Sequence, residues 1–158
     1  MKTKHTEPIS WSHSSLRELS AIELFEIFKL RQEVFILEQT CLYPDMDDTD
    51  LVALHLCGRI DQQLALYARV IPPGVTYPYA SIGRIVTAPN FRGSGFGKPL
   101  VSKAIELIEQ QFGNQKIKIG AQSGLQDFYH NWGFVTVSEE YIEDGIAHID
   151  MLRDAKQS

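Results

Sequence analysis

The segment from Arg92 to Lys98 combines small side chains with a position at the start of a predicted helix. Gly93, Gly95 and Gly97 follow a β-branched run and precede an amphipathic stretch. Backbone N–H groups at a helix N-terminus lack intrahelical partners and lie at the positive end of the helix dipole. Because glycines leave these groups uncovered, the pattern favours an anion-binding loop, with a closely packed helix start as the alternative.

Two well-known phosphate motifs do not fit this loop. A P-loop needs a glycine five residues before the Gly97–Lys98 pair and Ser or Thr after it, but the chain has Arg92 and Pro99 there. A dinucleotide fingerprint needs a third glycine where the chain has Lys98. The anion, if one binds, is therefore held in another way.

Three arginines, Arg31, Arg69 and Arg84, fall in elements that the pattern predicts to form the core. Arg31 lies on the apolar stripe of the first predicted helix, as does Glu38 if the helix extends that far, and a charge on such a stripe needs a partner or a ligand. If the arginines converge, they favour a carboxylate or another anionic part of a substrate. Taken singly, each is better explained as an ion-pair partner of Glu38 or Asp45.

His55 and Glu38 are the candidates for accepting a proton. His55 lies in a predicted strand, and imidazole titrates near neutral pH, although a lone strand histidine is more often structural. Glu38 is expected on the buried side of the first helix, whereas Glu33 points away and is expected to be solvated. We assign His148 and Asp150, in the last predicted strand, to the fold.

The remaining metal or nucleophile candidates carry little signal. The two cysteines lack C-x-x-C spacing and are read as ordinary thiols. The acidic stretch lacks the glycine and the terminal glutamate of an EF-hand loop, so it predicts an exposed loop and no metal site. These residues are Cys41 and Cys57, and Asp45, Asp47, Asp48 and Asp50.

The elements that must position these residues follow a clear order: strand, helix, three strands, helix, strand, helix and two strands. Asp61 and Gln62 predict a tight hairpin between the second and third strands, and Ser123 with Gln126 predicts a capping box for the third helix. Hairpins and one crossover are both required, which indicates an α/β (α+β) fold with a mixed, mostly antiparallel central sheet of about seven strands flanked by helices. The expected strands lie near 9–12, 53–60, 62–71, 79–87, 116–121, 134–141 and 147–152, and the expected helices near 20–37, 97–112 and 123–132.

Length and composition narrow the class. The 158 residues predict a single domain, 1–158, and the hydrophobic share of 44% and charged share of 22% are those of a globular protein. A net charge of −5 disfavours nucleic acid as a partner. No apolar run approaches the ~20 residues that cross a bilayer, and the N-terminal stretch has no secretory pattern, so we expect no membrane and a cytoplasmic protein.

The motifs together resemble a known family. R-x-x-G-x-G at Arg92, Gly95 and Gly97, after a β-branched strand and Pro89, resembles the coenzyme A signature of the GNAT N-acetyltransferase superfamily, and "FYHNWGF" is similar to its second signature. The segments "LRQEVFILEQTCLYPDMD", "YARV", "IGRIV", "AQSGLQDFYHNWGF" and "YIEDGIAHIDM" resemble the ElaA-like branch. The resemblance implies the GNAT acyl-CoA N-acyltransferase fold and transfer of an acetyl group from acetyl-CoA to a primary amine of a small metabolite or peptide.

The resemblance also implies roles. One strand amide would polarise the thioester carbonyl, and Tyr129 would protonate the leaving thiolate, although its stripe position alone suggests a core aromatic. No metal takes part. The strand Ile85, Val86 and Thr87 would line the pantetheine arm, and the loop Arg92, Gly93, Ser94, Gly95, Phe96, Gly97 and Lys98 would hold the diphosphate.

Three other functions stay open at this point. A non-catalytic acyl-CoA-binding sensor would keep the cofactor cleft, and an interaction protein would reuse only the fold. "LRQEVF" is faintly similar to acyl-homoserine lactone synthases, whose fold is related. Edge strands near the C-terminus make a homodimer an expectation as well.

Overall fold

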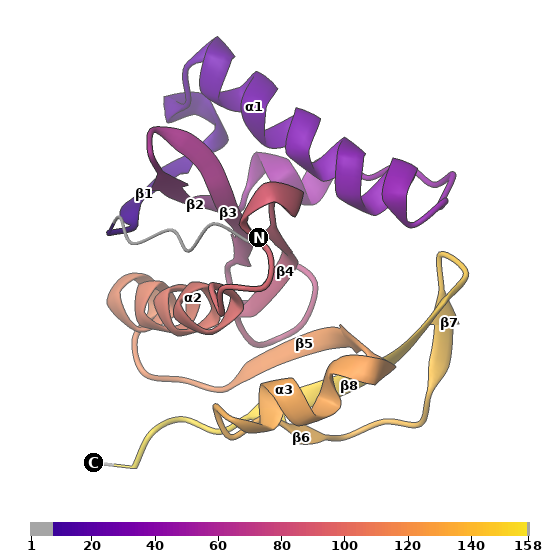
Figure 1. Cartoon of the computed structure of the whole chain (residues 1–158). Coiled ribbons are helices and arrows are strands. Elements are labelled where there is room, and N and C mark those ends of the chain that lie inside the picture. The colour runs from indigo at the N-terminus through magenta and orange to yellow at the C-terminus, as the bar shows by residue number, and fades with distance from the viewer. Residues whose placement is uncertain (1–7, 158) are drawn as a thin grey trace.

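The structure is a computed structural model that describes residues 8–157, which form eight strands, three α-helices and several short helical turns (Figure 1). The N-terminal stretch in which the sequence showed no secretory pattern lies largely in residues 1–7, outside the described part. The strands and helices are β1 (Ser10–Ser15), α1 (Ala21–Arg31), β2 (Leu54–Ile60), β3 (Gln63–Ile71), β4 (Ser81–Thr87), α2 (Gly97–Phe112), β5 (Ile117–Gln122), α3 (Gln126–His130), β6 (Val135–Thr136), β7 (Tyr141–Glu143) and β8 (Ile146–Arg153).

The strands form two four-stranded sheets. The first has the order β1-β2-β3-β4, and in the second β8 pairs with β5, β6 and β7; all the pairings within both sheets are antiparallel. The β2–β3 turn is a tight hairpin in which Asp61 and Gln62 have positive φ values of 51° and 65°, as the sequence predicted. The α+β fold with mostly antiparallel strands is therefore confirmed.

A single bridge joins the two sheets. Ala80, just before β4, pairs in parallel with Ile117 at the start of β5, and the Lys118 amide donates to the Ala80 carbonyl at 3.0 Å. Beyond this bridge, β4 and β5 separate and no further ladder joins them within residues 8–157. The predicted continuous sheet is thus split along one line.

Helices cover both faces of the first sheet. Figure 1 shows α1 on one side of it and α2 on the other. The apolar stripe of α2 is buried through Leu100, Val101, Ala104 and Ile108, and the helix ends at Gly113 with φ 85°, where glycine removes the cost of a left-handed residue. The described residues contain no helix long and apolar enough to cross a membrane.

The first helix changes its winding after Arg31. α1 begins at Ser20, whose side chain accepts from the Glu23 amide at 3.1 Å, and the next seven residues, Gln32–Glu38, are π-helical. The Cys41 amide donates to the Ile36 carbonyl, five residues back. A π-helical turn shifts the angular phase of the residues after it, so the periodicity that placed Glu38 on the buried side does not apply.

Two other sequence expectations are wrong in detail. The predicted strand 134–141 divides into β6 and β7, because the Ser138 hydroxyl accepts from the Asp150 amide at 2.8 Å in place of a backbone carbonyl. The capping box at Ser123 is absent: its hydroxyl has no hydrogen-bond partner among the described residues, and the Gln126 side-chain amide donates instead to the Ser123 carbonyl at 3.2 Å. A 3-10 turn, Ser123–Leu125, stands where the cap was expected.

Candidate functional site

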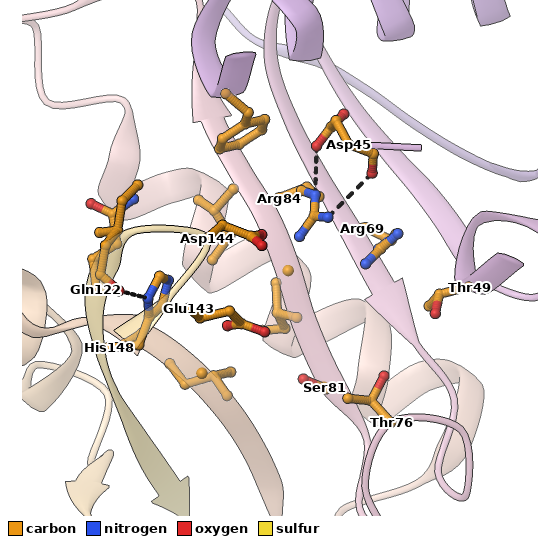
Figure 2. A pocket seen from close by; sticks show the side chains of 18 of the residues that line it. Asp45, Thr49, Arg69, Thr76, Ser81, Arg84, Gln122, Glu143, Asp144 and His148 are labelled. Atoms are coloured by element: carbon orange, nitrogen blue, oxygen red, sulfur yellow. Dashed lines mark hydrogen bonds and ion pairs between the residues drawn. The ribbon is translucent and has the colours of Figure 1, made fainter. Parts of the chain in front are cut away.

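A cleft of about 420 Å³ occupies the space where β4 and β5 separate. Side chains and backbone of both strands line it, together with the loop after the first helix and the β7–β8 hairpin. Figure 2 shows Arg69, Arg84 and Asp45 on one side of this cleft and Glu143, Asp144 and His148 on the other. The site therefore lies at the junction of the two sheets.

A bulge in β4 shapes one side of the cleft. Arg84 has a φ of 51°, and the β3–β4 register shifts between Tyr67 and Arg69. A bulge of this kind bends a strand and redirects its side chains. Ile85 lines the cleft beside it, whereas the Val86 side chain, 4% exposed, belongs to the core. The edge of β4 that faces β5 is left without a partner strand and can bond an extended ligand through its backbone.

The glycine loop lies directly after this open edge. Gly93 and Gly95 adopt φ values of 83° and 80°, which favour glycine. Their amides donate no hydrogen bond within residues 8–157, and a Cβ built on Gly95 would meet no atom within 4 Å. Uncovered donors at the N-terminus of α2, with free space in front of them, fit a diphosphate group.

Arg92 ties this loop to its surroundings. Its Nε donates to the Thr87 carbonyl at 3.3 Å, and its Nη1 lies 2.8 Å from Oε1 of Glu38. Glu38 is therefore an exposed ion-pair partner of the loop and does not line the cleft. This corrects its expected position as a proton acceptor on the buried side of the first helix, and the reason is the π-helical shift described above.

Tyr129 lies in α3 with its side chain against the cleft. The residue is only 7% exposed, and its ring packs edge-on against Phe128 and Phe134. Its hydroxyl forms no hydrogen bond within residues 8–157. Burial raises the pKa of Tyr129 to about 12, so the phenol holds its proton until a strong base lies next to it.

One side of the cleft consists of paired charges, which we call the paired wall: Arg69, Arg84, Asp45 and Asp47 line the cleft, and Arg31 and Asp50 lie behind them. Arg31 is its hub, with no exposed surface; it bonds Asp45 at 2.8 Å and Asp50 at 2.7 Å. Burial alone would raise the pKa of Asp50, but the hydrogen bond and charge of Arg31 outweigh it and lower that pKa. The acidic stretch is thus buried at Asp45 and Asp50, not an exposed loop as predicted.

The other two arginines reach the cleft itself. Arg69 bonds Asp47 at 2.7 Å and Asp50 at 3.2 Å, and its Nε is buried without a partner in the described residues. Arg84 donates to Asp45 at 2.7 Å. The three arginines do lie close together, but three aspartates balance their charge. Arg31 makes no contact with the cleft, so we reassign it from the substrate to the framework.

His55 is part of the same buried framework. Its Nε2 lies 3.0 Å from the Asp50 carbonyl oxygen, which can only accept, so Nε2 carries the proton and Nδ1 accepts from the Tyr67 hydroxyl at 2.7 Å. Burial lowers the pKa of His55 and keeps the ring neutral. With 1% exposure and both nitrogens engaged, His55 cannot reach an amine in the cleft, which corrects its expected role as a proton acceptor.

Sequence reasoning missed the side of the cleft that the β7–β8 hairpin forms, which we call the open wall: Glu143, Asp144 and His148. Neither carboxylate forms an ion pair with any described residue, and all three residues line the cleft. Asp144 and Gly145 form the hairpin turn with φ values of 51° and 77°. Nothing in the sequence indicated the position of this hairpin beside β5.

Neither cysteine has the surroundings of a nucleophile. Cys57 is buried, and burial raises its pKa to about 12, which suppresses the reactive thiolate. The Cys41 Sγ donates to the Asp144 carbonyl at 3.1 Å and so links the loop after the first helix to the open wall. Within residues 8–157, no group of three or more metal-ligating side chains comes together.

Comparison with known proteins agrees with this geometry. Residues 36–154 match the family model described as an acetyltransferase (GNAT) domain. A UPF0039 protein of Synechocystis is 41% identical over 91% of this chain and 94% of its own length, and the Escherichia coli protein ElaA is 36% identical over 95% and 99%. The ElaA crystal structure superposes with a TM-score of 0.86 over 93% of this chain and all of that chain. An acyl-CoA N-acyltransferase from Pseudomonas aeruginosa gives 0.88 at 36% identity, covering 92% of this chain and 99% of its own.

Proposed function

The chain belongs to the GNAT acetyltransferase family, within its ElaA-like branch, and from that premise we propose that it transfers an acetyl group from acetyl-CoA to a primary amine of a small metabolite or peptide by direct attack. The observation that carries this proposal is the uncovered glycine loop at the end of the free β4 edge, beside a cleft between two sheets. Acetyl-CoA supplies an activated thioester. The chain supplies binding, orientation and proton transfer.

The glycine loop supports the diphosphate position. The amides of Gly93 and Gly95 are free to donate, and Ser94, Phe96, Gly97 and Lys98 complete the same turn into α2. In this proposal the free edge of β4 at Ile85 to Thr87 bonds the pantetheine amides, as an added strand would. A β4 amide next to the bulge then stabilises the oxyanion that forms at the thioester carbonyl.

Tyr129 is the proposed proton donor to the thiolate. Its hydroxyl has no protein partner and faces the cleft, and its raised pKa keeps it protonated before the reaction. A phenol can give its proton to sulfur as negative charge develops there. The hydrophobic packing of Phe128 and Phe134 around the ring fixes the direction of the hydroxyl.

The acceptor is proposed to enter between the paired wall and the open wall. Arg69 and Arg84 offer guanidinium donors there, but Asp45 and Asp47 already compensate their charge. We therefore expect them to orient a polar acceptor through hydrogen bonds more than to attract a net anion. Glu143 and Asp144 leave the open wall negative, which favours the ammonium end of an amine.

The test measures coenzyme binding and turnover separately. Calorimetry compares CoA with S-acetylpantetheine, which lacks the diphosphate, and we expect the wild type to bind CoA more tightly. Free thiol is then followed with acetyl-CoA and a panel of L-lysine, other amino acids, putrescine, an aminoglycoside and a lysine peptide. Thiol release above hydrolysis supports the enzyme. CoA binding without release for any amine favours the sensor, and no CoA binding favours the interaction protein.

A further inference from the structure

His148 is the titratable side chain in the cleft that is held in place yet keeps a free nitrogen. It lies on β8 opposite Gln122, the last residue of β5. From Gln122 the chain runs through one short turn into α3, which carries Tyr129. The register of β5 and β8 therefore puts His148 beside the segment that carries the proposed proton donor, and both residues line the same cleft.

The hydrogen bonding of His148 fixes its tautomer. Nδ1 lies 2.8 Å from the Ile146 carbonyl oxygen. Because that oxygen can only accept, Nδ1 carries the proton, and in the neutral ring Nε2 keeps a lone pair. Nε2 forms no hydrogen bond with any residue from 8 to 157.

The ring is also held in orientation. Tyr141 stacks on it with centroids 6.1 Å apart and an angle of 20° between the planes. The Tyr141 hydroxyl in turn donates to Asp150 at 2.6 Å, and Asp150 is paired with Lys118 at 3.8 Å. A ring restrained on one nitrogen and on one face is preorganised to accept a proton at the other nitrogen.

The charged and titratable groups near His148 come from the neighbouring strands, the hairpin turn, α3 and the loop before β4. From β7 and the hairpin turn, Glu143 and Asp144 face the cleft without ion-pair partners among the described residues, and Asp150 lies two positions along β8. Lys118 on β5 offsets Asp150, and Tyr129 on α3 and Tyr77 from the loop before β4 add only neutral phenols to the lining. Imidazole is ordinarily a stronger base than a carboxylate near neutral pH.

We propose that His148 Nε2 accepts the proton from the acceptor amine in the transfer reaction; the proposal rests on the proposed function. The ammonium gives one proton to His148, and the free amine then forms a C–N bond with the acetyl carbon as the C–S bond breaks. Tyr129 protonates the departing sulfur and regains a proton from the second N–H through solvent. One proton, released later from His148, is the net product besides the amide and the free thiol.

The decisive variant is His148→Asn, whose side-chain amide can still donate to Ile146 but offers no basic nitrogen. With acetyl-CoA and the panel amine that releases thiol fastest, we expect kcat/KM to fall by about 100-fold. The acidic limb of the kcat/KM profile should disappear, and CoA affinity and thermal stability should stay as in the wild type. His13→Asn, an exposed histidine on β1, is the matched control and should change neither rate nor profile.

Besides an unchanged rate in His148→Asn, two results would overturn the role of His148. One is an acidic limb that persists in His148→Asn but vanishes in Glu143→Gln, which assigns the proton to the carboxylate. The other result does not depend on turnover. It is a long-range ¹H–¹⁵N spectrum of protein labelled with ¹⁵N-histidine in which the neutral ring of His148 carries its proton on Nε2 and not on Nδ1. The His148 signal is assigned by its loss in His148→Asn. If the wild type is active and His148→Asn has the same rate, only the role of His148 is excluded. If the wild type is inactive with every amine, the proposed function is excluded, and the role of His148 with it.

Discussion

The charged groups in the two walls of the cleft differ in whether they have partners within the protein. In the paired wall, three arginines and three aspartates satisfy one another, and Arg31 has no exposed surface. In the open wall, the carboxylates of Glu143 and Asp144 and the Nε2 of His148 form no hydrogen bond or ion pair with any described residue. A buried charge is tolerated only with a partner, whereas a group that takes part in the reaction must keep a hydrogen-bonding position open for the substrate. The contrast separates residues that hold the cleft open from residues available to the reaction.

The largest expected effect comes from removing Arg31, the central arginine of the paired wall. Arg31→Met leaves Asp45 and Asp50 buried without their shared cation, and we expect a loss of about 3–5 kcal/mol in the free energy of unfolding. Denaturant unfolding followed by circular dichroism measures it. Arg59→Met removes a partly buried arginine that pairs with Glu26 and donates to the Gln62 carbonyl at the surface, and it should cost no more than about 1 kcal/mol. Equal losses in the two variants would remove the distinction between framework and surface pairs.

The next effect falls on turnover and spares the fold. Tyr129→Phe keeps the ring packing but removes the unpartnered hydroxyl, so we expect kcat to fall by about 100-fold with CoA affinity unchanged. Initial rates at saturating amine, with calorimetry for CoA, measure the two quantities. Tyr79→Phe, a tyrosine outside the cleft that lies near Lys116, is the control. A Tyr129→Phe protein with wild-type kcat would contradict the role of proton donor.

A smaller expected effect concerns the pH dependence of the free energy of unfolding, to which His55 contributes. Burial lowers the pKa of His55 in the folded state, so the unfolded chain binds more protons between that lowered pKa and about 6.5. The stabilisation is complete above about pH 6.5 and is lost as the pH falls towards the folded pKa. Unfolding free energy measured from pH 8 to pH 5 should decline in the wild type, and His55→Gln should flatten this decline. An equally steep decline in His55→Gln would place the titration elsewhere.

The smallest effect concerns the exposed pair beside the glycine loop. Glu38→Gln frees Arg92 from its carboxylate partner, and we expect CoA to bind up to about five-fold more tightly, with unfolding changed by less than about 1 kcal/mol. Glu33→Gln removes the same charge from the same π-helical segment, on an exposed side chain that forms no ion pair with any residue from 8 to 157. Calorimetry with CoA compares them. A matching gain in both variants would point to net charge in place of the Arg92 contact.

Local patterns were enough to predict much of the fold. The turn at Asp61 and Gln62, the α2 stripe ending at Gly113 and the glycine loop all depend on neighbouring residues and one backbone preference. The order of these elements left few ways to arrange the strands. Tyr129 and the loop were proposed as site residues from short motifs, which also act locally.

The rest depends on contacts between distant segments. His55 forms hydrogen bonds with the Tyr67 hydroxyl and the Asp50 carbonyl, and nothing in the sequence of its own strand indicates these partners. Glu38 was misplaced because a π-helical turn changes the phase without a marker such as proline or glycine. His148 was assigned to the fold because its value as a base depends on which strand edge lies beside β8 and on a bond to Ile146.

The β-bridge between Ala80 and Ile117 joins the two sheets at one point in the described residues, and it determines how the sheets can move when a ligand enters the cleft. Past this link no ladder of amide bonds joins the sheets in the described chain, so a change of angle between them is resisted by van der Waals contacts and by isolated hydrogen bonds such as that from Cys41 to the Asp144 carbonyl. Van der Waals contacts weaken gradually with distance, whereas hydrogen bonds fail abruptly. We therefore expect the angle between the sheets to change more easily than the packing within either sheet, with displacement growing from Ala80 towards Thr87.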